Sequence, residues 1–136
     1  MIRTAFKISV SQCGTRAIYV DAVNSEEILA FLKQDSRYRK KFLYIQKVIL
    51  ENHRMPQVYD KEEINDRCKG VTAMKMFKGQ ENARIYCKEI ITEDKVFVVI
   101  ASELLERKKS HKLTKKDKQL IEKVAKYEYV LEEPEE

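Results

Sequence analysis

The stretch that decides the fold runs from Val71 to Ser102 and reads VTAMKMFKGQENARIYCKEIITEDKVFVVIAS. Apolar and polar side chains alternate through 71–77 and 83–91, a pattern typical of strands with one buried face. Residues 95–102 are apolar at nearly every position, which favours a strand covered on both faces. Short turn sequences separate these runs. They predict a three-stranded antiparallel meander, with 95–102 near the centre of a sheet.

The first half of the chain predicts a hairpin followed by two helices. Residues 4–10 and 16–23 alternate on either side of the turn sequence CGT, as the strands of a β-hairpin do. Apolar residues then recur at helical spacing through 25–52 and predict two successive helices. The residues that follow, 53–60, are typical of a loop.

Capping residues mark where helices begin. Asn24 with Glu27 three positions later has the form of a capping box. Thr114 is placed to cap a last helix, which we expect over 115–131. The final residues, 132–136, contain four glutamates and one proline, and we expect them to be disordered.

These elements predict an α+β fold in a single domain spanning 1–136. We expect a small antiparallel or mixed sheet with two helices packed on one face and a C-terminal helix. Residues 1–24 add an N-terminal strand or hairpin. The chain has 136 residues, of which 43% are apolar and 36% charged, enough for a modest core under a densely charged surface.

Composition excludes several classes of function. The formal net charge of +5 permits nucleic acid, an acidic protein or anionic lipid as a partner without selecting among them. Three isolated glycines rule out a glycine-rich phosphate loop. The three cysteines form no C-x-x-C pair, so we expect neither a disulfide framework nor a metal site. The chain has no membrane-spanning apolar run, and we expect a cytoplasmic protein without a cofactor.

Cations stand at unusual places on the predicted strands. Alternation puts Arg84, Tyr86 and Lys88 on one face of 83–91, and Lys75 stands among apolar residues on 71–77. The ordinary explanation for charges on a strand is a solvated face. A concave face that contacts phosphate is the alternative.

A basic segment follows the predicted central strand. Residues 106–118, ERKKSHKLTKKDK, contain seven lysines or arginines. Lysines are slightly unfavourable at a helix start, because the helix dipole favours acids there. His111 is the only histidine near these cations, and its near-neutral pKa would suit proton transfer. The segment is therefore either a solvated helix entrance or a phosphate contact.

The second half of the chain resembles a known family. GVTAMKMFKGQENARIYCKEI and KVFVVIASELLERKKSHKLTKKDKQLIEKV are similar to the RelE/ParE superfamily of bacterial type II toxins. The nearest likeness is to its HigB-like branch, which includes related phage proteins. The resemblance covers about residues 25–130. Lys75 stands where that branch often has an arginine, and the stretch 1–24 is longer than usual.

The resemblance implies a RelE-like fold and an enzyme. Such toxins are small, metal-independent endoribonucleases, or mRNA interferases, which cut messenger RNA on the ribosome and so inhibit translation. Their ribose 2′-OH attacks the adjacent phosphorus and leaves a cyclic phosphate and a free 5′-OH. The implied partners are a cognate antitoxin, expected to be a small helix-turn-helix protein, together with mRNA and the ribosome.

The resemblance also suggests which residues carry the chemistry. The expected catalytic residues are Lys75, Arg84, Arg107 and His111. The expected substrate-binding residues are Lys78, Tyr86, Lys88, Lys108, Lys109 and Lys112. Arg84 and Arg107 would hold the phosphate, His111 would act as the acid, and Tyr86 would stack on a base. Lysine at position 75 weakens the expected clamp, because it lacks the bidentate fork of arginine.

Two other functions fit the same sequence. ParE-type relatives bind DNA gyrase and cut no RNA. A degenerate toxin that survives only as a basic RNA-binding or protein-binding module is the third possibility. The lysines of 108–112 argue for RNA cleavage, since the gyrase-binding relatives generally lack a full set of cationic and proton-transfer groups.

Overall fold

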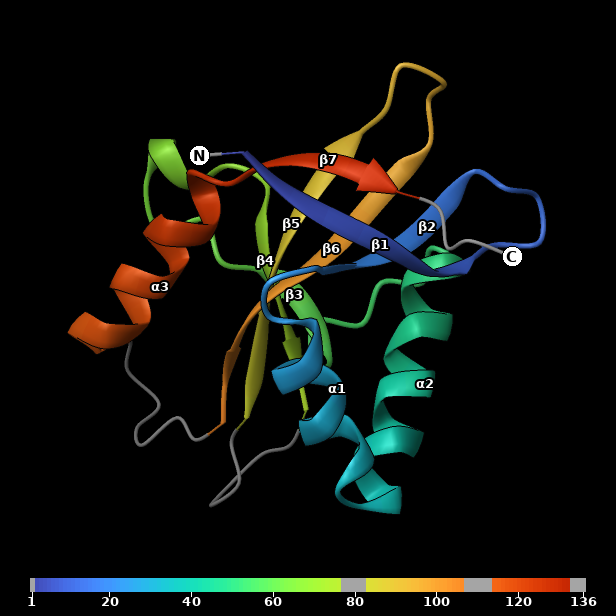
Figure 1. Cartoon of the computed structure of the whole chain (residues 1–136), viewed down its shortest axis with the longest axis horizontal. Helices are drawn as coiled ribbons and strands as arrows, with labels where there is room; N and C mark the ends of the chain where they lie inside the picture. The colour runs from blue at the N-terminus through green and yellow to red at the C-terminus, as the bar shows by residue number, and fades with distance from the viewer. Residues whose placement is uncertain (1, 77–82, 107–113, 133–136) are drawn as a thin grey trace.

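A computed structural model describes residues 2–76, 83–106 and 114–132, and Figure 1 shows its arrangement. The described strands form one seven-stranded mixed sheet in the order β3-β4-β5-β6-β2-β1-β7. The strands are β1 (Ile2–Val10), β2 (Arg16–Asp21), β3 (Tyr59–Lys61), β4 (Val71–Lys75), β5 (Arg84–Ile91), β6 (Phe97–Leu105) and β7 (Glu128–Glu132). The helices are α1 (Ser25–Lys33), α2 (Ser36–Leu50) and α3 (Lys115–Ala125), with a short 3₁₀ turn at Asp66–Cys68.

The predicted meander is confirmed. Strands β4, β5 and β6 pair antiparallel in sequence order. Strand β6 occupies the middle of the sheet, and its residues 98–102 are all buried, as its apolar run predicts. Gly70 enters β4 with φ +85°, and a Cβ there would lie 3.2 Å from the Glu89 carbonyl oxygen. Glycine is therefore required at this turn.

The predicted N-terminal hairpin is also confirmed, and it extends the sheet. Strands β1 and β2 pair antiparallel, and β2 lies parallel to the central strand β6. Strand β1 in turn pairs with β7, which comes from the other end of the chain. The sheet is therefore mixed, and with seven strands it is larger than we expect from the sequence.

Helices cover both faces of the sheet. The helices α1 and α2 pack on the face that carries Ile18, Val20 and Val99, which we call the helix-pair face. The predicted helix pair is thus confirmed. Helix α3 packs on the opposite face, the α3 face, where Ile121 and Val124 meet Val71, Ala73 and Tyr86. Each fully buried large side chain stabilises the fold by about 1.5–3 kcal/mol.

The predicted capping box at the start of α1 is wrong. The Asn24 side chain makes no cap bond. Its amide donates instead to the Ser102 carbonyl at 2.7 Å and to Oε2 of Glu103 at 3.0 Å, both on β6. Two partners distant in the sequence outcompete the local cap. At α3 the Thr114 box forms as predicted, with Asp117 as the reciprocal partner.

The C-terminal helix is shorter than the sequence predicts. It ends at Ala125, and 128–132 form strand β7 instead of the helix expected to continue to residue 131. Strand pairing wins because Tyr129 donates its hydroxyl to Asp21 at 2.7 Å, a bond that a longer helix would lose. Glu132 belongs to this strand, and the rest of the predicted acidic tail lies outside the described residues.

One further strand refines the predicted loop and sheet. Residues 59–61, which include the end of the loop expected over 53–60, form the edge strand β3 and pair antiparallel with β4. Strand β3 is only three residues long, so little of its free edge is open to pairing with another chain.

A buried carboxylate joins the N-terminal hairpin to β7. Arg3 donates to Asp21 through Nε at 2.6 Å and Nη2 at 3.0 Å, and its guanidinium lies 4.0 Å from the centre of the Tyr127 ring. Asp21 is fully buried and also accepts from the Tyr129 hydroxyl and the Asn24 backbone. Burial by itself raises the pKa of Asp21, but these hydrogen bonds, from Arg3 first, hold it below its ordinary value.

We expect Asp21→Asn to lower the free energy of unfolding by about 3 kcal/mol at neutral pH, because it removes the buried carboxylate charge that accepts from Arg3. A depressed carboxyl pKa gives stability that is complete above about pH 4, where unfolded aspartate is ionised, and is lost as the pH falls further. The difference between wild type and variant should therefore shrink below that pH. Urea unfolding at a series of pH values measures both effects.

Lys47→Ala is the matched control, because it removes an exposed 4.0 Å ion pair with Glu51. Its effect should stay below about 1 kcal/mol at every pH. Equal stability of Asp21→Asn and wild type at neutral pH would contradict the role given to the buried pair.

Candidate functional site

Arg84 and Lys75 lie side by side at one end of the sheet. Arg84 begins β5 and pairs with Lys75, the last residue of β4, on one side. On its other side it pairs with Leu105, the last residue of β6. Three strand ends therefore meet here, and two of them carry a cation.

The Arg84 guanidinium is the least satisfied charged group of the described residues. The side chain is half-buried, and its Nε and Nη1 atoms are buried with no hydrogen-bond partner among the parts of the chain that the structure describes. A buried donor without a partner costs about 1–3 kcal/mol, and more if it is charged. Such a group can recover this cost by binding an anion. The planar fork of N–H donors on a guanidinium suits two oxygens of a phosphate.

Tyr86 lies two residues further along β5, on the same α3 face. Its side chain is fully buried, and its hydroxyl also has no partner within the described ranges. Burial first, and then the charges of Asp117 and Glu62, raises the pKa of Tyr86, so the hydroxyl keeps its proton and remains a donor. A buried ring cannot stack on an RNA base in this conformation, and the stacking role expected from the sequence does not fit.

Lys75 occupies the end of β4, beside Arg84. Its Nζ donates to the Pro56 carbonyl at 2.9 Å, which uses one of the three donors of the ammonium. The contact holds the side chain against the loop before β3. Lys75 thus brings a second positive charge to the strand end where the Arg84 guanidinium lies.

The structure assigns Lys88 to the support of α3. Its Nζ donates to the Ala125 carbonyl at 2.6 Å and to the Tyr127 carbonyl at 2.7 Å, where α3 ends. Desolvation by these surroundings lowers the pKa of Lys88 from its ordinary value. Lysine at a helix C-terminus satisfies carbonyls that the helix leaves unpaired. We therefore leave Lys88 out of the site, although the sequence predicts a substrate contact for it.

Six expected site residues lie outside the described residues. They are Lys78, Arg107, Lys108, Lys109, His111 and Lys112. Their roles remain predictions from the sequence.

Glu103, an acid on the same face, is not predicted from the sequence as a site residue. Glu103 pairs with Tyr86 across the strands, next to an irregularity in the β5–β6 register. Its carboxylate accepts from the Tyr127 hydroxyl and from the Asn24 amide, and Lys123 lies 3.8 Å away. Glu103 follows an apolar run and would have been taken for the polar end of a strand. No local signal marks its partners, which lie about 20 or more residues away.

A second polar chain lies on the helix-pair face, in a cavity of about 300 Å³ under the loop after α2. Thr72 donates to the Tyr59 hydroxyl at 2.7 Å, and Tyr59 donates to Glu89 at 2.5 Å. Burial raises the pKa of Glu89 above its ordinary value. These three side chains satisfy one another's hydrogen bonds. Unlike Arg84, they therefore leave no buried donor for a ligand to pair with.

No group of metal-ligating side chains occurs in the described ranges, and none of the described helices is long and apolar enough to cross a membrane. Comparison with protein-family models, with curated proteins and with solved structures finds no match. The function therefore has to be argued from the geometry of this site and from the sequence.

Lys88→Met tests the capping role. We expect the free energy of unfolding to fall by about 1–3 kcal/mol, because two carbonyls at the end of α3 lose a charged donor. Lys126→Met, which changes an exposed lysine next to the same helix end, should alter it by no more than about 0.5 kcal/mol. Urea unfolding of the two variants gives the comparison. Unchanged stability of Lys88→Met would leave substrate contact as the better explanation.

Arg84→Met tests the unsatisfied guanidinium. We expect wild-type protein to gain about 1.4 kcal/mol of stability from inorganic phosphate at ten times its dissociation constant. The variant should lose this gain while remaining at least as stable as wild type without phosphate, because the unpaired buried charge is gone. Thermal unfolding with and without phosphate measures both.

The exposed Arg54→Met is the control for general salt effects, which stabilise every variant alike. Phosphate should raise the melting temperature of this control as it does that of wild type. An equal phosphate response in Arg84→Met would show that Arg84 holds no anion.

Proposed function

We propose that the chain is the toxin of a type II toxin–antitoxin system, and that it is a metal-independent endoribonuclease which cuts ribosome-bound mRNA. One observation carries this proposal: the buried Nε and Nη1 of Arg84 have no partner among the described residues, at a strand end that also carries Lys75. Phosphodiester oxygens would supply the missing acceptors.

The cleavage needs three groups at the scissile phosphate. The 2′-oxygen bonds to phosphorus as its proton leaves to a base, and the bond from phosphorus to the 5′-oxygen breaks as an acid protonates that oxygen. Negative charge grows on the phosphoryl oxygens between these steps. Arg84 stabilises that charge with preorganised N–H donors, a contribution that is commonly the largest single one in catalysis. Lys75 adds a second positive charge on the same phosphate.

The architecture supports the proposal in its order of elements. A helix pair, an antiparallel meander and a C-terminal helix follow one another, as the resemblance to RelE-like toxins implies. The departures are at the sheet edges, where β1 and β7 add two paired strands beyond β2. The antitoxin, the ribosome and the acid role of His111 come from the resemblance alone.

Arg84→Ala should reduce cleavage of translated mRNA by roughly 10²–10³-fold, the loss typical when one charge-stabilising donor is removed. Arg84→Lys should recover part of the activity, because it restores the charge but not the bidentate fork. Primer-extension mapping of transcripts after induction detects the new 5′ ends. Arg54→Ala should cleave as wild type does.

Wild-type cleavage by Arg84→Ala would remove the centre of the proposal. Growth arrest without new transcript ends, accompanied by inhibition of gyrase, would favour the ParE-type function instead. Absence of both effects would favour a degenerate binding module.

A further inference from the structure

The helical layer on the helix-pair face stops short of two strands. Among the described residues, no side chain of β1 or β7 belongs to the core cluster that α1 and α2 form on the sheet. Phe6 pairs with Val20, whose side chain lies in that cluster, so Phe6 points to the same face. Phe6 is nevertheless 38% exposed. A register shift between Lys7 and Ser9 pairs Val10 with Ala17 on the other face, so the uncovered apolar strip of β1 beside the helix pair is the part around Phe6.

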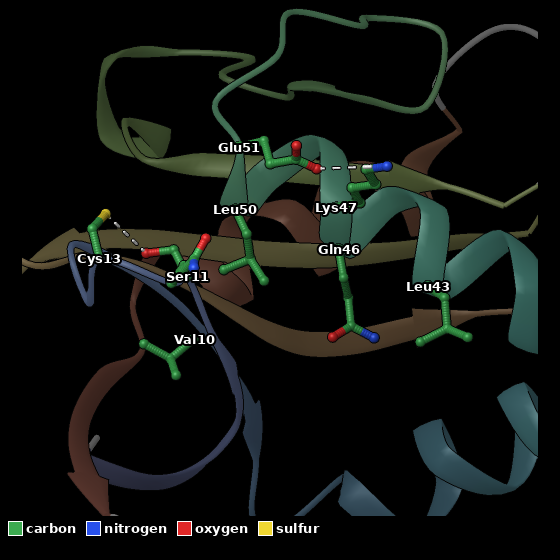
Figure 2. A pocket seen from close by; sticks show the side chains of 9 residues that line it. Val10, Ser11, Cys13, Leu43, Gln46, Lys47, Leu50 and Glu51 are labelled. Carbon is green, nitrogen blue, oxygen red and sulfur yellow. Dashed lines mark hydrogen bonds and ion pairs between the residues drawn. The ribbon is translucent and has the colours of Figure 1, made fainter.

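A groove runs between the β1–β2 hairpin turn and α2. A cavity of about 730 Å³ is bounded by Val10 and the hairpin turn on one side and by Leu43 and Leu50 on the other. Figure 2 shows the leucines on the side of α2 that faces Val10. Leu43 is 64% exposed, an unusual position for a leucine at the middle of a helix whose other face is buried.

The groove continues past Leu43 onto the helix pair. A second hollow of about 200 Å³ lies between α1 and α2, and Leu29, Leu32 and Phe42 line it together with Leu43. Leu43 lines both hollows, so they adjoin each other along α2, and we call the two together the channel. Contiguous apolar surface of this kind marks interaction sites in soluble proteins.

Positive charges border the channel. Lys33 and Arg39 line the hollow between the helices, and Lys47 lines the cavity beside the hairpin. The acid at this border is Glu51, which lies 4.0 Å from Lys47 and offsets part of its charge. The floor is mainly apolar, with Gln46 between Leu43 and Leu50, and together with the basic border it fits an apolar stripe flanked by acids.

We propose that this channel binds an acidic amphipathic helix from a partner protein. The uncovered strip lies where a third helix would complete the layer that α1 and α2 begin. From Arg39 to Leu50 the channel follows about 17 Å of α2, which matches a partner helix of about 12 residues. Leucine-type side chains at i, i+3, i+4 and i+7 fill the floor, and glutamates or aspartates face the basic border.

A second copy of this chain fits the channel poorly. An isologous contact would place Lys33, Arg39 and Lys47 of both copies around one interface. Like charges brought together in this way are unfavourable. The channel also lies on the face opposite Tyr86 and the α3 cluster, so its occupant and the proposed nuclease activity are tested independently.

A synthetic helical peptide of about 14 residues tests the proposal, with leucines along one face and glutamates on the other. Titration of the labelled peptide with full-length protein, followed by fluorescence anisotropy, should give saturable binding. A peptide with lysines in place of the glutamates should bind at least about tenfold more weakly, a difference of about 1.4 kcal/mol. A peptide of the same composition with its leucines spread around the helix should bind as weakly.

Leu43→Glu should weaken binding of the acidic peptide by at least about tenfold, because it places a like charge on the apolar floor. The change is at an exposed position and should leave the fold intact. Ile91→Glu is the matched control, since Ile91 is 69% exposed but belongs to neither hollow. Its affinity for the peptide should equal that of wild type.

Cys13 provides a footprint of the occupied channel. It lines the cavity, and hydrogen bonds from the Thr15 hydroxyl first lower its pKa to about 7. The thiolate fraction at neutral pH makes it the cysteine that iodoacetamide alkylates, because Cys68 and Cys87 are buried and burial raises their pKa. Bound acidic peptide should slow alkylation of Cys13, and Leu43→Glu should remove that protection.

Three results would overturn the proposal. One is the absence of saturable binding by the acidic peptide. Another is equal binding by the lysine peptide or by Leu43→Glu. The third is a wild-type dimer that Leu43→Glu dissociates, since the occupant would then be a second copy of the chain. Cleavage of mRNA by Leu43→Glu should match wild type in every case.

Discussion

The buried carboxylate of Asp21 ties three strands together. It stands at the end of β2 and accepts from Arg3 on β1 and from the Tyr129 hydroxyl on β7. Bringing two charges out of water is costly, and only a fully hydrogen-bonded arrangement repays it. Without this carboxylate the meander and β2 would keep their pairing, but β1 and β7 would lose the polar anchor that supplements their backbone pairing. The edge of the sheet therefore depends on one buried acid as well as on its strand register.

Local periodicity was enough to predict the meander, the hairpin and the helix pair, because each repeats its pattern over five or more residues. The errors occur where a distant partner decides. The Asn24 side chain does not cap α1, because it donates to two acceptors on β6 instead. The last helix ends before residue 131, because Tyr129 donates to Asp21 from strand β7. The sequence contains every one of these groups, but a period of two or 3.6 residues carries no information about contacts more than 70 residues apart.

For the candidate site, too, the sequence shows local placement but does not show which distant partners each side chain has. Alternation assigned Arg84 and Lys75 each to a face of its strand, but the register that makes them neighbours comes from the structure. Alternation also could not separate a cation with open donors from an occupied one. Arg84 and Lys88 look alike in the sequence, yet the Arg84 guanidinium keeps buried donors without partners among the described residues, while Lys88 closes the end of α3. Burial and partners, which are properties of the fold, decide which cation can act on a ligand.

Pairing between β1 and β7 has a consequence for how the protein is made. Ile2 pairs with Glu128, so β1 has to wait for a strand that is synthesised much later. During synthesis β1 can form its hairpin with β2 early, but its other edge stays open until β7 has left the ribosome. Contacts this distant in sequence also slow folding, because the long loop between them must close first. The sheet therefore cannot be completed before β7 is made, and an open edge strand is the part most exposed to aggregation in that interval.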